Sequence, residues 1–563
     1  MLNDLGLVNI DSLHELAAAA TVAEDEDVVP KKFNDAWNHP DEQKRKKWRS
    51  AIQKEFTDYT RRGCLDKIPR SKVPVKNKWV FNIKRNGIYR ARLVACGYSQ
   101  VPGQDFVEYY SPVINDTTFK LVLMLLAMHP QWIAKIADTE TAFLHGDLDE
   151  QIFMNIPEGY DKVIGPASNE NECLLLTASI DGLVQAARMY FLKVTKMLRQ
   201  AGFVGGNVDP CLFYRRNKKG TVVIAIYVDD NLIIGDEKAV DDVIEQMECF
   251  GFTLKVTDNM WDYLSCRIVF NGDRSRGVIC QPHIYEKLSK EYDHLVKNIT
   301  YTTPGTPNHY VILERDEAKR LSEEKHAIFR TGVGLLLFLV KHSRPDIANA
   351  VRSLSTVVSS PNEHAWKEML RVIKYALDTK EYGLKLNVKR DNRANGKWEL
   401  TCYSDSDYAG NPDTRRSISG HVLFLNGIPI SFSSKAQKSV TLSSSEAEWI
   451  ALSEAVKEIV FVVNLLRDIN IDVATPIIVN VDNQGAIFMA YNANTSARTR
   501  HVDIRTKFVR EYCSGDDPLI KIVFCMSENN TSDICTKNLA GELHSKHSKQ
   551  LISKVDWKDE TRE

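Results

Sequence analysis

The chain has 563 residues, of which 43% are hydrophobic and 26% are charged, with 28 Gly and 19 Pro. These proportions are typical of globular domains and exclude a collagen-like, disulfide-stapled or wholly disordered protein. At ~100–200 residues per domain, the length predicts about three to five folding units. The net charge of −1 excludes a global attraction to polyanions, so any nucleic-acid site must be local.

The cysteines and the N-terminal charges indicate the cellular compartment. Eleven cysteines without a C-x-x-C pair predict reduced, mostly buried thiols rather than disulfides or a zinc ribbon. The first 30 residues contain seven acids and no Lys or Arg, and no apolar run reaches the ~18–20 residues of a membrane span. We therefore expect an intracellular protein.

Residues 1–45 show little apolar periodicity, which predicts a tail and linker before a fold that begins near Trp48. The next segment, 61–95, contains eleven Lys or Arg against one Asp. Within it, KWVFNIKRNGIYRARLVACGY alternates around Asn-Gly at 86–87, which predicts a β-hairpin. This basic hairpin is either a local phosphate-binding surface or a solvated sheet edge.

Three acids lie at predicted strand ends. Residues 119–129 predict an apolar helix, QWIAKIAD predicts a strand that ends in Asp138, and 221–236 predict a hairpin with Asp229 and Asp230 at its tip. Grouped carboxylates would repel one another in a low-dielectric cleft unless cations occupied it. Mg²⁺ or Mn²⁺ suits such ligands, and two ions ~3.5–4 Å apart promote phosphoryl transfer. The alternative for the Asp-Asp pair is ordinary turn chemistry.

The rest of the chain divides into a helical and an α/β segment. Residues 239–250 and most of 283–390 predict helices with a break at Pro345, and the polar run 389–397 predicts a domain boundary. Strands, the long helix SSSEAEWIALSEAVKEIVFVVNLLRDI and a further strand and helix follow. This order predicts an α/β layer.

Several blocks occur in a characteristic order, among them KWVFNIKRNGIYRARLVACGYSQVPGQDF, DTETAFLHGDLDEQIFMNIPEGY, YVDDNLIIGD, YSDSDYAGNPDTRRSISG and LSSSEAEWIALSEA. From about Trp48 to Leu539 the chain resembles the reverse transcriptase and ribonuclease H region of copia-type LTR retrotransposon polyproteins. The resemblance implies an α+β right-hand polymerase with fingers, palm and thumb, followed by an α/β ribonuclease H-like domain. The expected domains are a tail and linker (1–45), fingers and palm (46–275), a mostly helical thumb/connection (276–396), the ribonuclease H-like domain (397–545) and a tail (546–563).

The resemblance implies roles in the polymerase. Asp138 and Asp229 match the family's metal-holding carboxylates, and Asp230 matches the adjacent acid. Phe143 matches an aromatic residue that would clash with a ribose 2′-OH and so select dNTPs; packing in a helix core is the alternative. The other substrate-binding residues are expected on the basic hairpin and in SIDGLVQAARMY: Lys84, Arg90, Arg92, Gln185 and Arg188. Which of the three hairpin residues contacts the triphosphate stays open.

The chain departs from the family pattern in two places. Asp181, Val184 and Ala187 replace Tyr, Lys and Pro in a stretch that usually reads SLYGLKQAPRQW, which affects packing beside the nascent base pair. Ser265 stands in YLSCRI, where the family more often has Leu-Gly at the turn that holds the primer. We therefore expect an altered backbone at this turn.

In the C-terminal unit the resemblance implies four metal-holding acids, Asp405, Glu448, Asp482 and Asp533. Glu446 competes with Glu448 for the second position. Ser443 and Glu446 form a capping box, which gives Glu446 a structural role, whereas Glu448 shares the helix face that packs on the sheet. The sequence therefore favours Glu448.

Other residues of this unit stay open. His501 and Asp503 are the alternatives to Asp533, and they lie in a stretch with five Arg or Lys between Arg498 and Arg510 that could follow a nucleic-acid backbone. Asp407 shares the strand face of Asp405 and either assists or is solvated.

These assignments predict an RNA-directed DNA polymerase with ribonuclease H activity on RNA–DNA hybrids, using Mg²⁺ or Mn²⁺ in both sites. The expected partners are an RNA template, a DNA or tRNA primer, dNTPs and the hybrid, without a membrane. The expected location is the cytoplasm, in a virus-like particle, or the nucleus. The alternative is a decayed or host-derived relic that binds nucleic acid without catalysis.

Overall fold

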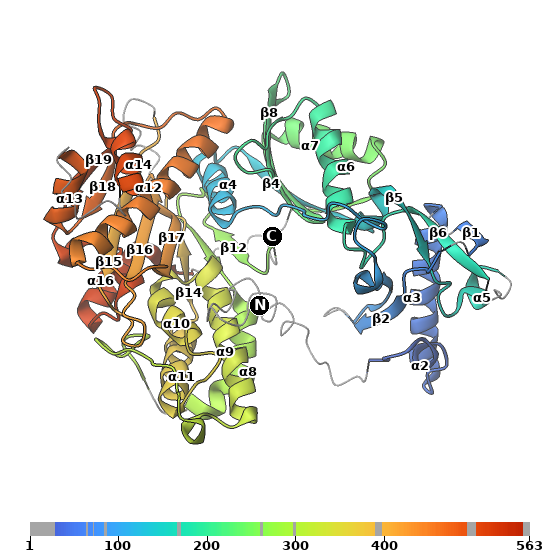
Figure 1. Cartoon of the computed structure of the whole chain (residues 1–563). Helices are drawn as coiled ribbons and strands as arrows, with labels where there is room; N and C mark the ends of the chain where they lie inside the picture. Colours follow the sequence, from blue (N-terminus) through green and yellow to red (C-terminus); the bar gives the residue numbers. More distant parts are fainter. Residues whose placement is uncertain are drawn as a thin grey trace.

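The computed structural model describes ten stretches of the chain, namely residues 29–63, 66–70, 72–83, 87–165, 171–258, 260, 263–296, 300–388, 397–492 and 503–555. The elements form an arch, with the N-terminal helices in one leg and the helices of residues 282–378 together with the C-terminal sheet in the other (Figure 1). Within these stretches, no helix combines the length and the apolar character needed to cross a bilayer.

The N-terminal part packs helices on the basic hairpin and on a three-stranded sheet of order β1-β6-β5. Asp41 caps α3 by accepting from the Lys44 N–H at 2.9 Å, and α3 buries Trp48 and Phe56 on one face. The elements are α2 (Phe33–Trp37), α3 (Glu42–Arg61), β1 (Asp66–Pro69), β2 (Asn77–Ile83), β3 (Tyr89–Ala95), β5 (Asp147–Met154), α5 (Tyr160–Val163) and β6 (Glu172–Ala178). The predicted hairpin is confirmed as β2 and β3.

The expected tail 1–45 is wrong for its last part, because folded elements are already present at Phe33, before Trp48. Phe33 and Ala36 are buried, and the Phe33 ring lies 5.8 Å from that of Trp79. A five-residue helix is too short to show a periodicity, so its aromatic contact was not visible in the sequence.

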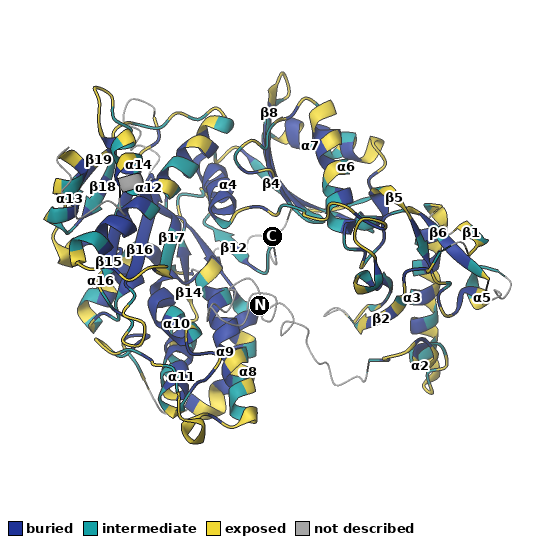
Figure 2. Cartoon of the chain, viewed as in Figure 1, coloured by how far each residue is buried: buried dark blue, intermediate teal, exposed yellow. Residues whose placement is uncertain are grey.

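The central part is built on a six-stranded antiparallel sheet of order β11-β4-β10-β9-β8-β7. The elements are α4 (Asp116–Met128), β4 (Ile133–Thr139), α6 (Ala186–Gln200), β7 (Val204–Gly205), β8 (Leu212–Asn217), β9 (Gly220–Tyr227), β10 (Asp230–Gly235), α7 (Glu237–Cys249) and β11 (Leu254–Thr257). The predicted apolar helix is confirmed as α4, which is buried from Thr117 to Met128 (Figure 2). It is buried all round because the C-terminal unit packs on it, with Thr117 Oγ1 donating to Glu458 Oε1 at 2.9 Å.

A helical part follows, with a four-stranded sheet of order β12-β13-β14-β20. Its elements are β12 (Arg267–Phe270), β13 (Gly277–Cys280), α8 (Pro282–Val296), α9 (Glu323–His342), α10 (Ala348–Ser355), α11 (Glu363–Asp378), β14 (Tyr382–Lys385) and β20 (Ile552–Lys554). The predicted break at Pro345 is confirmed, and beside it the buried Arg344 Nη2 lies 2.8 Å from Asp346 Oδ2. The predicted boundary 389–397 falls outside the described residues except for Lys397.

The C-terminal unit is a five-stranded sheet of order β17-β16-β15-β18-β19, in which β15, β18 and β19 are parallel. Its elements are β15 (Leu400–Asp407), β16 (Ile418–Leu425), β17 (Ile428–Ala436), α12 (Ser444–Asp468), β18 (Ile477–Val481), α13 (Gln484–Tyr491), α14 (Asp503–Cys513), β19 (Ile520–Phe524), α15 (Asp533–Thr536) and α16 (Gly541–Leu551). Together with the six-stranded sheet, this confirms the predicted class: an α+β part followed by an α/β unit.

The expected tail 546–563 is wrong for residues 546–554. Helix α16 continues to Leu551, and β20 pairs with β14 in the register Leu384 opposite Ile552. A three-residue strand has no readable alternation, and its partner lies far away in the sequence, so only the tertiary fold reveals it.

Candidate functional sites

The first candidate site lies where β4 and β10 run antiparallel, with Asp230 directly opposite Asp138. Opposite residues of a ladder project on the same face of the sheet. Asp229 precedes β10 in a tight turn, and its carbonyl oxygen accepts from the Thr139 N–H at 3.1 Å. Val228 in this turn has φ 51°, a conformation that strains a β-branched residue. The three predicted acids therefore lie at neighbouring strand ends, as the sequence predicts.

A pocket of about 400 Å³ opens beside these strand ends. It is lined by Asp138 and Asp229 at the strand ends, by Phe143, and by Arg90 and Arg92 of the hairpin. The two arginines alternate with the buried Ala91 and so project to one face of β3. The structure thus brings five of the predicted residues to one cavity. Lys84 lies outside the described residues.

Asp230 does not line this pocket. Burial, followed by the charges of Asp229 and Asp138, raises the pKa of Asp230 to about 6. A carboxyl group held between two others releases its proton reluctantly unless a cation compensates the charge. Asp138, Asp229 and Asp230 thus form an acidic centre at this sheet edge. Because a cation would stabilise their ionised forms, the centre favours cation binding.

Four more acids line the pocket, Glu55, Asp58, Glu140 and Asp181, and sequence reasoning either missed them or treated them only as a departure. Glu55 and Asp181 both contact β3 of the hairpin. Glu55 of α3 accepts from the Leu93 N–H at 2.9 Å, and burial raises the pKa of Glu55 to about 7. Asp181, the residue that replaces Tyr, places Oδ1 3.9 Å from Arg92 Nε. Its pKa is raised by burial, against the opposing influence of Arg92. Glu55 was missed because its segment was read as the start of a fold without being assigned to a helix face.

Gln185 and Arg188 do not line the pocket. Gln185 is fully buried, accepts from Gln100 Nε2 at 3.1 Å and donates to the Asp105 carbonyl at 2.8 Å. Arg188 pairs with Glu108. Both residues therefore hold the segment 100–108 against the start of α6.

The turn at Ser265 keeps the conformation that glycine favours. Leu264 and Ser265 have φ 52° and 58°, and the Cys266 N–H donates to the Tyr263 carbonyl at 2.9 Å. Ser265 thus occupies the left-handed region, which glycine adopts more readily than serine, and the expected difference from the family's backbone stays a prediction.

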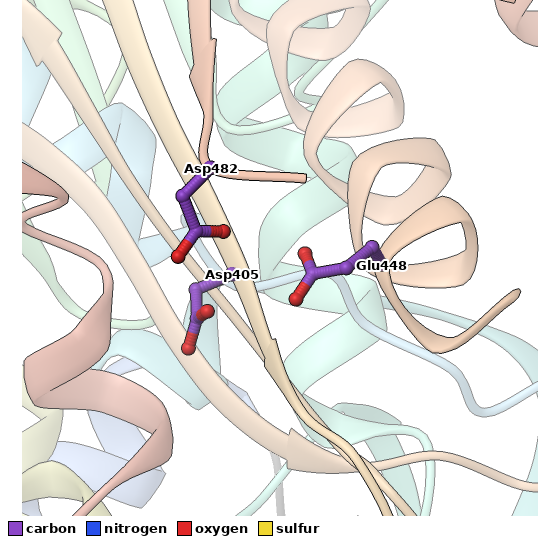
Figure 3. A group of neighbouring side chains, drawn as sticks. All are labelled: Asp405, Glu448 and Asp482. Carbon is purple, nitrogen blue, oxygen red and sulfur yellow. The ribbon is translucent and has the colours of Figure 1, made fainter. Parts of the chain in front are cut away.

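The second candidate site lies at the end of β15. Ligand atoms of Asp405, Glu448 and Asp482 lie within 4.8 Å of one another, and the three side chains lie side by side (Figure 3). Among the described residues, this is the one group of three or more His, Cys, Asp or Glu side chains so close together. Asp405 comes from β15, Glu448 from α12 and Asp482 from the end of β18.

The carboxylate oxygens of this group differ in their hydrogen bonding. Glu448 Oε1 accepts from the Ser406 N–H at 3.1 Å, whereas the buried Oε2 has no hydrogen-bond partner. Asp482 Oδ2 accepts from Ser527 Oγ at 2.6 Å. Burial, then the charges of Asp405 and Asp482, raises the pKa of Glu448 to about 9. An orphaned oxygen among three oxygen ligands fits a hard divalent cation.

The fourth predicted acid, Asp533, is linked to Asp405 by Lys537, which forms an ion pair with both carboxylates. Lys537 Nζ lies 3.1 Å from Asp405 Oδ1 and 3.3 Å from Asp533 Oδ1. Thr536 Oγ1 also donates to Asp405. Burial, then Asp405, raises the pKa of Asp533 to about 8. Sequence reasoning missed Lys537, although its position four residues after Asp533 on a helical turn was available as a signal.

The remaining alternatives are placed as follows. Glu446 lies outside the group: its N–H donates to Ser443 Oγ at 3.2 Å and its Oε2 accepts from the Leu442 N–H at 2.8 Å. Asp407 is neither in the group nor simply solvated, because Tyr310 donates to its Oδ2 at 2.6 Å. His501 lies outside the described residues, as does the side chain of Asp503.

Comparisons with known proteins agree with this architecture. A family model described as reverse transcriptase (RNA-dependent DNA polymerase) matches residues 64–307. The Pol polyprotein from transposon TNT 1-94 of Nicotiana tabacum is 30% identical over 542 residues, covering 93% of this chain and 39% of that protein. The Pol polyprotein from transposon RE1 of Arabidopsis thaliana is 29% identical over 513 residues, covering 88% and 33%.

The match defines a protein with a reverse transcriptase domain. Over most of its length the chain is similar to copia-type retrotransposon Pol polyproteins, and it spans between a third and two fifths of the length of these two relatives. Among solved structures, a foamy viral protease-reverse transcriptase in complex with double-stranded DNA aligns with a TM-score of 0.46 at 14% identity, over 84% of this chain and 69% of that chain. A likeness at this level carries no argument about function.

Proposed function

We propose that the pocket between hairpin and palm carries out RNA-directed DNA synthesis. The observation that carries this proposal is the single cavity that gathers Asp138, Asp229, Arg90, Arg92 and Phe143. Arginines on one wall suit a triphosphate, and carboxylates on the other suit the cations that accompany it. An aromatic ring between them suits the sugar, with selection against a 2′-OH.

We propose Mg²⁺ or Mn²⁺ as the cofactor of this pocket. Asp138 and Asp229 would hold it, since both offer oxygen ligands at the pocket wall. When bound, such ions stabilise the charge that develops during phosphoryl transfer. The raised pKa of Asp230 supports this fit, because the charges of Asp229 and Asp138 add to the effect of burial and a bound cation would offset them.

For the C-terminal unit we propose hydrolysis of RNA in an RNA–DNA hybrid. Asp405, Glu448 and Asp482 would hold a divalent cation, supported by the unpartnered Glu448 Oε2. Asp533 would supply the fourth carboxylate. The two activities form a sequence, in which one site copies RNA and the other removes the copied strand. Selectivity for the hybrid would come from contacts to the 2′-OH of one strand.

The partners we propose follow from these two sites: an RNA template, a DNA or tRNA primer, dNTPs and the hybrid product. We also propose that the protein acts in the cytoplasm, within a virus-like particle, or in the nucleus.

The test uses the full chain with two variants and two matched controls. Asp229→Asn is expected to abolish extension of a primer on RNA, and Asp482→Asn to abolish cleavage of the hybrid, each without affecting the other activity. Asp293→Asn and Asp472→Asn, which change exposed acids elsewhere, should retain both. Nucleic-acid binding by a wild type that has neither activity would identify a non-catalytic relic instead.

A further inference from the structure

The carboxylates of the C-terminal site divide into two halves with different surroundings. In one half, Asp405 and Asp533 share the ammonium group of Lys537, at 3.1 and 3.3 Å. In the other half, neither Glu448 nor Asp482 forms an ion pair with any lysine or arginine that the structure describes. The centre is therefore compensated on one side only.

The position of Lys537 is fixed by its own local structure. Its N–H donates to the Asp533 carbonyl at 2.9 Å, which closes the turn of α15, and its Nζ lies 3.3 Å from Asp533 Oδ1 on the same turn. The Lys537 side chain is one third exposed, whereas those of Asp405 and Asp533 are 1% and 5% exposed. Two carboxylates this deeply buried need a positive charge between them, and the chain supplies it from within.

The electrostatics of the lysine agree with this geometry. Burial lowers the pKa of Lys537, but the charges of Asp405 and Asp533 more than offset this effect and leave the pKa raised. Lys537 is thus held as a cation at the place where an anionic pair would otherwise attract a metal ion.

We propose that Lys537 acts as a built-in stand-in for one of two divalent ions of this site. A first ion can bind between Asp405, Glu448 and Asp482. A second ion can bind between Asp405 and Asp533, but only when the Lys537 ammonium moves away. Lys537 is then a positioning residue that makes the affinities of the two ions unequal. The biological role of this arrangement rests on the proposed ribonuclease H function, whereas the metal-binding measurements that test it do not.

The first experiment measures Mn²⁺ binding to the full chain by electron paramagnetic resonance. In an Asp229→Asn background, which weakens the palm site, Lys537→Met is expected to tighten the weaker Mn²⁺ site of the C-terminal unit by about tenfold. Lys537→Arg keeps the charge and should bind as the wild type does. Lys549→Met removes a charge from an exposed part of α16 and is the matched control.

A second measurement needs no variant. Addition of Mg²⁺ to the wild type should expel Lys537 from the carboxylates, so that an amine reagent labels Lys537 severalfold faster, as quantified by mass spectrometry, while labelling of Lys549 is unchanged. A third measurement compares melting temperatures of two variants. When a chelator removes divalent ions, Lys537→Met should melt at a lower temperature than Lys549→Met, and added Mn²⁺ should remove this difference.

The inference is overturned if Lys537→Met binds Mn²⁺ no more tightly than the wild type, or if labelling of Lys537 is insensitive to Mg²⁺. Loss of hybrid cleavage in Lys537→Met with unchanged Mn²⁺ binding would also overturn it, because the lysine would then act on the substrate. A different outcome separates the two proposals. If Lys537→Met binds Mn²⁺ more tightly but the wild type never cleaves the hybrid, the proposed nuclease function is wrong and the proposed role of Lys537 is supported.

Discussion

Asp181 lies beside Arg92 in the pocket between hairpin and palm, with its Oδ1 3.9 Å from the arginine Nε. The side chains are 22% and 39% exposed, so solvent screens part of the attraction. The pairing nevertheless places a negative charge beside one of the two arginines that we propose as triphosphate ligands. Tyr stands at this position in the family pattern, so the acid is a feature of this chain.

Asp181→Asn is expected to lower the KM for dNTPs by about two- to fivefold with little change in kcat, because Arg92 loses a competitor worth roughly 0.5–1 kcal/mol. Steady-state primer extension measures both constants. Asp58→Asn removes a charge from the α3 wall of the same pocket and serves as the control. A higher KM in Asp181→Asn would show that the acid orients Arg92 rather than competing for it.

Phe143→Ala is expected to admit ribonucleotides, because the ring at the pocket wall would no longer clash with a 2′-OH. Competition between dNTPs and rNTPs during primer extension gives the discrimination ratio before and after the change. Phe143 also packs against two hydrophobic cores, so Phe143→Leu, which keeps the packing, is the control for folding. An unchanged ratio in Phe143→Ala would show that the ring does not select against the 2′-OH and has only its packing role.

Glu55 makes stability depend on pH. Its folded pKa of about 7 lies above the ordinary 4.5, so the folded protein holds a proton that the unfolded chain releases between these values. The stability therefore falls as pH rises from 4.5 to 7, by on the order of 3 kcal/mol. Glu55→Gln should flatten this fall in urea midpoints measured from pH 5 to 8. Glu245→Gln, an exposed acid on α7, should leave the slope intact, and equal slopes in the two variants would contradict the prediction.

The sequence predicts most of the framework because its signals are local. Asn-Gly at 86–87 marks the hairpin, and apolar runs on both sides of Asp229 and Asp230 mark the second one, so the strands and their acidic tips follow from short-range patterns. The capping box at Ser443 separates Glu446 from Glu448 by the same kind of reasoning.

The features that the sequence does not predict depend on partners far along the chain. Lys537 meets Asp405 across 132 positions, and Tyr310 reaches Asp407 across 97. Periodicity carries no information about such pairs, because it reports which face a residue occupies and not what lies opposite. Gln185 and Arg188, two predicted substrate-site residues, contact the segment 100–108 instead of the pocket, and periodicity could not reveal that segment as their partner.

Ser265→Gly is expected to stabilise its turn by up to ~1 kcal/mol, because glycine adopts the left-handed conformation of this position without the penalty that serine carries. Hydrogen exchange at the Cys266 N–H, which donates across the turn, should slow by up to about fivefold. Ser265→Ala keeps a β-carbon and should not slow the exchange. Faster exchange in Ser265→Gly would mean that the serine side chain itself holds the turn.

Glu446 and Glu448 provide the sharpest separation of structural from chemical roles. They lie two residues apart on α12, but only Glu448 joins Asp405 and Asp482. Glu448→Gln is expected to eliminate cleavage of a labelled RNA–DNA hybrid in Mg²⁺, while primer extension survives, because one metal-holding oxygen ligand is lost from one site only.

Glu446→Gln is the matched control, since it makes the same chemical change on the same helix. Its side chain accepts from the Leu442 N–H at 2.8 Å, so the variant loses a charge-assisted contact at the helix start, on the order of 1 kcal/mol or less. Its melting temperature should fall slightly and its cleavage rate should be largely retained. An inactive Glu446→Gln beside an active Glu448→Gln would refute the assignment and move the second acid of the site to Glu446.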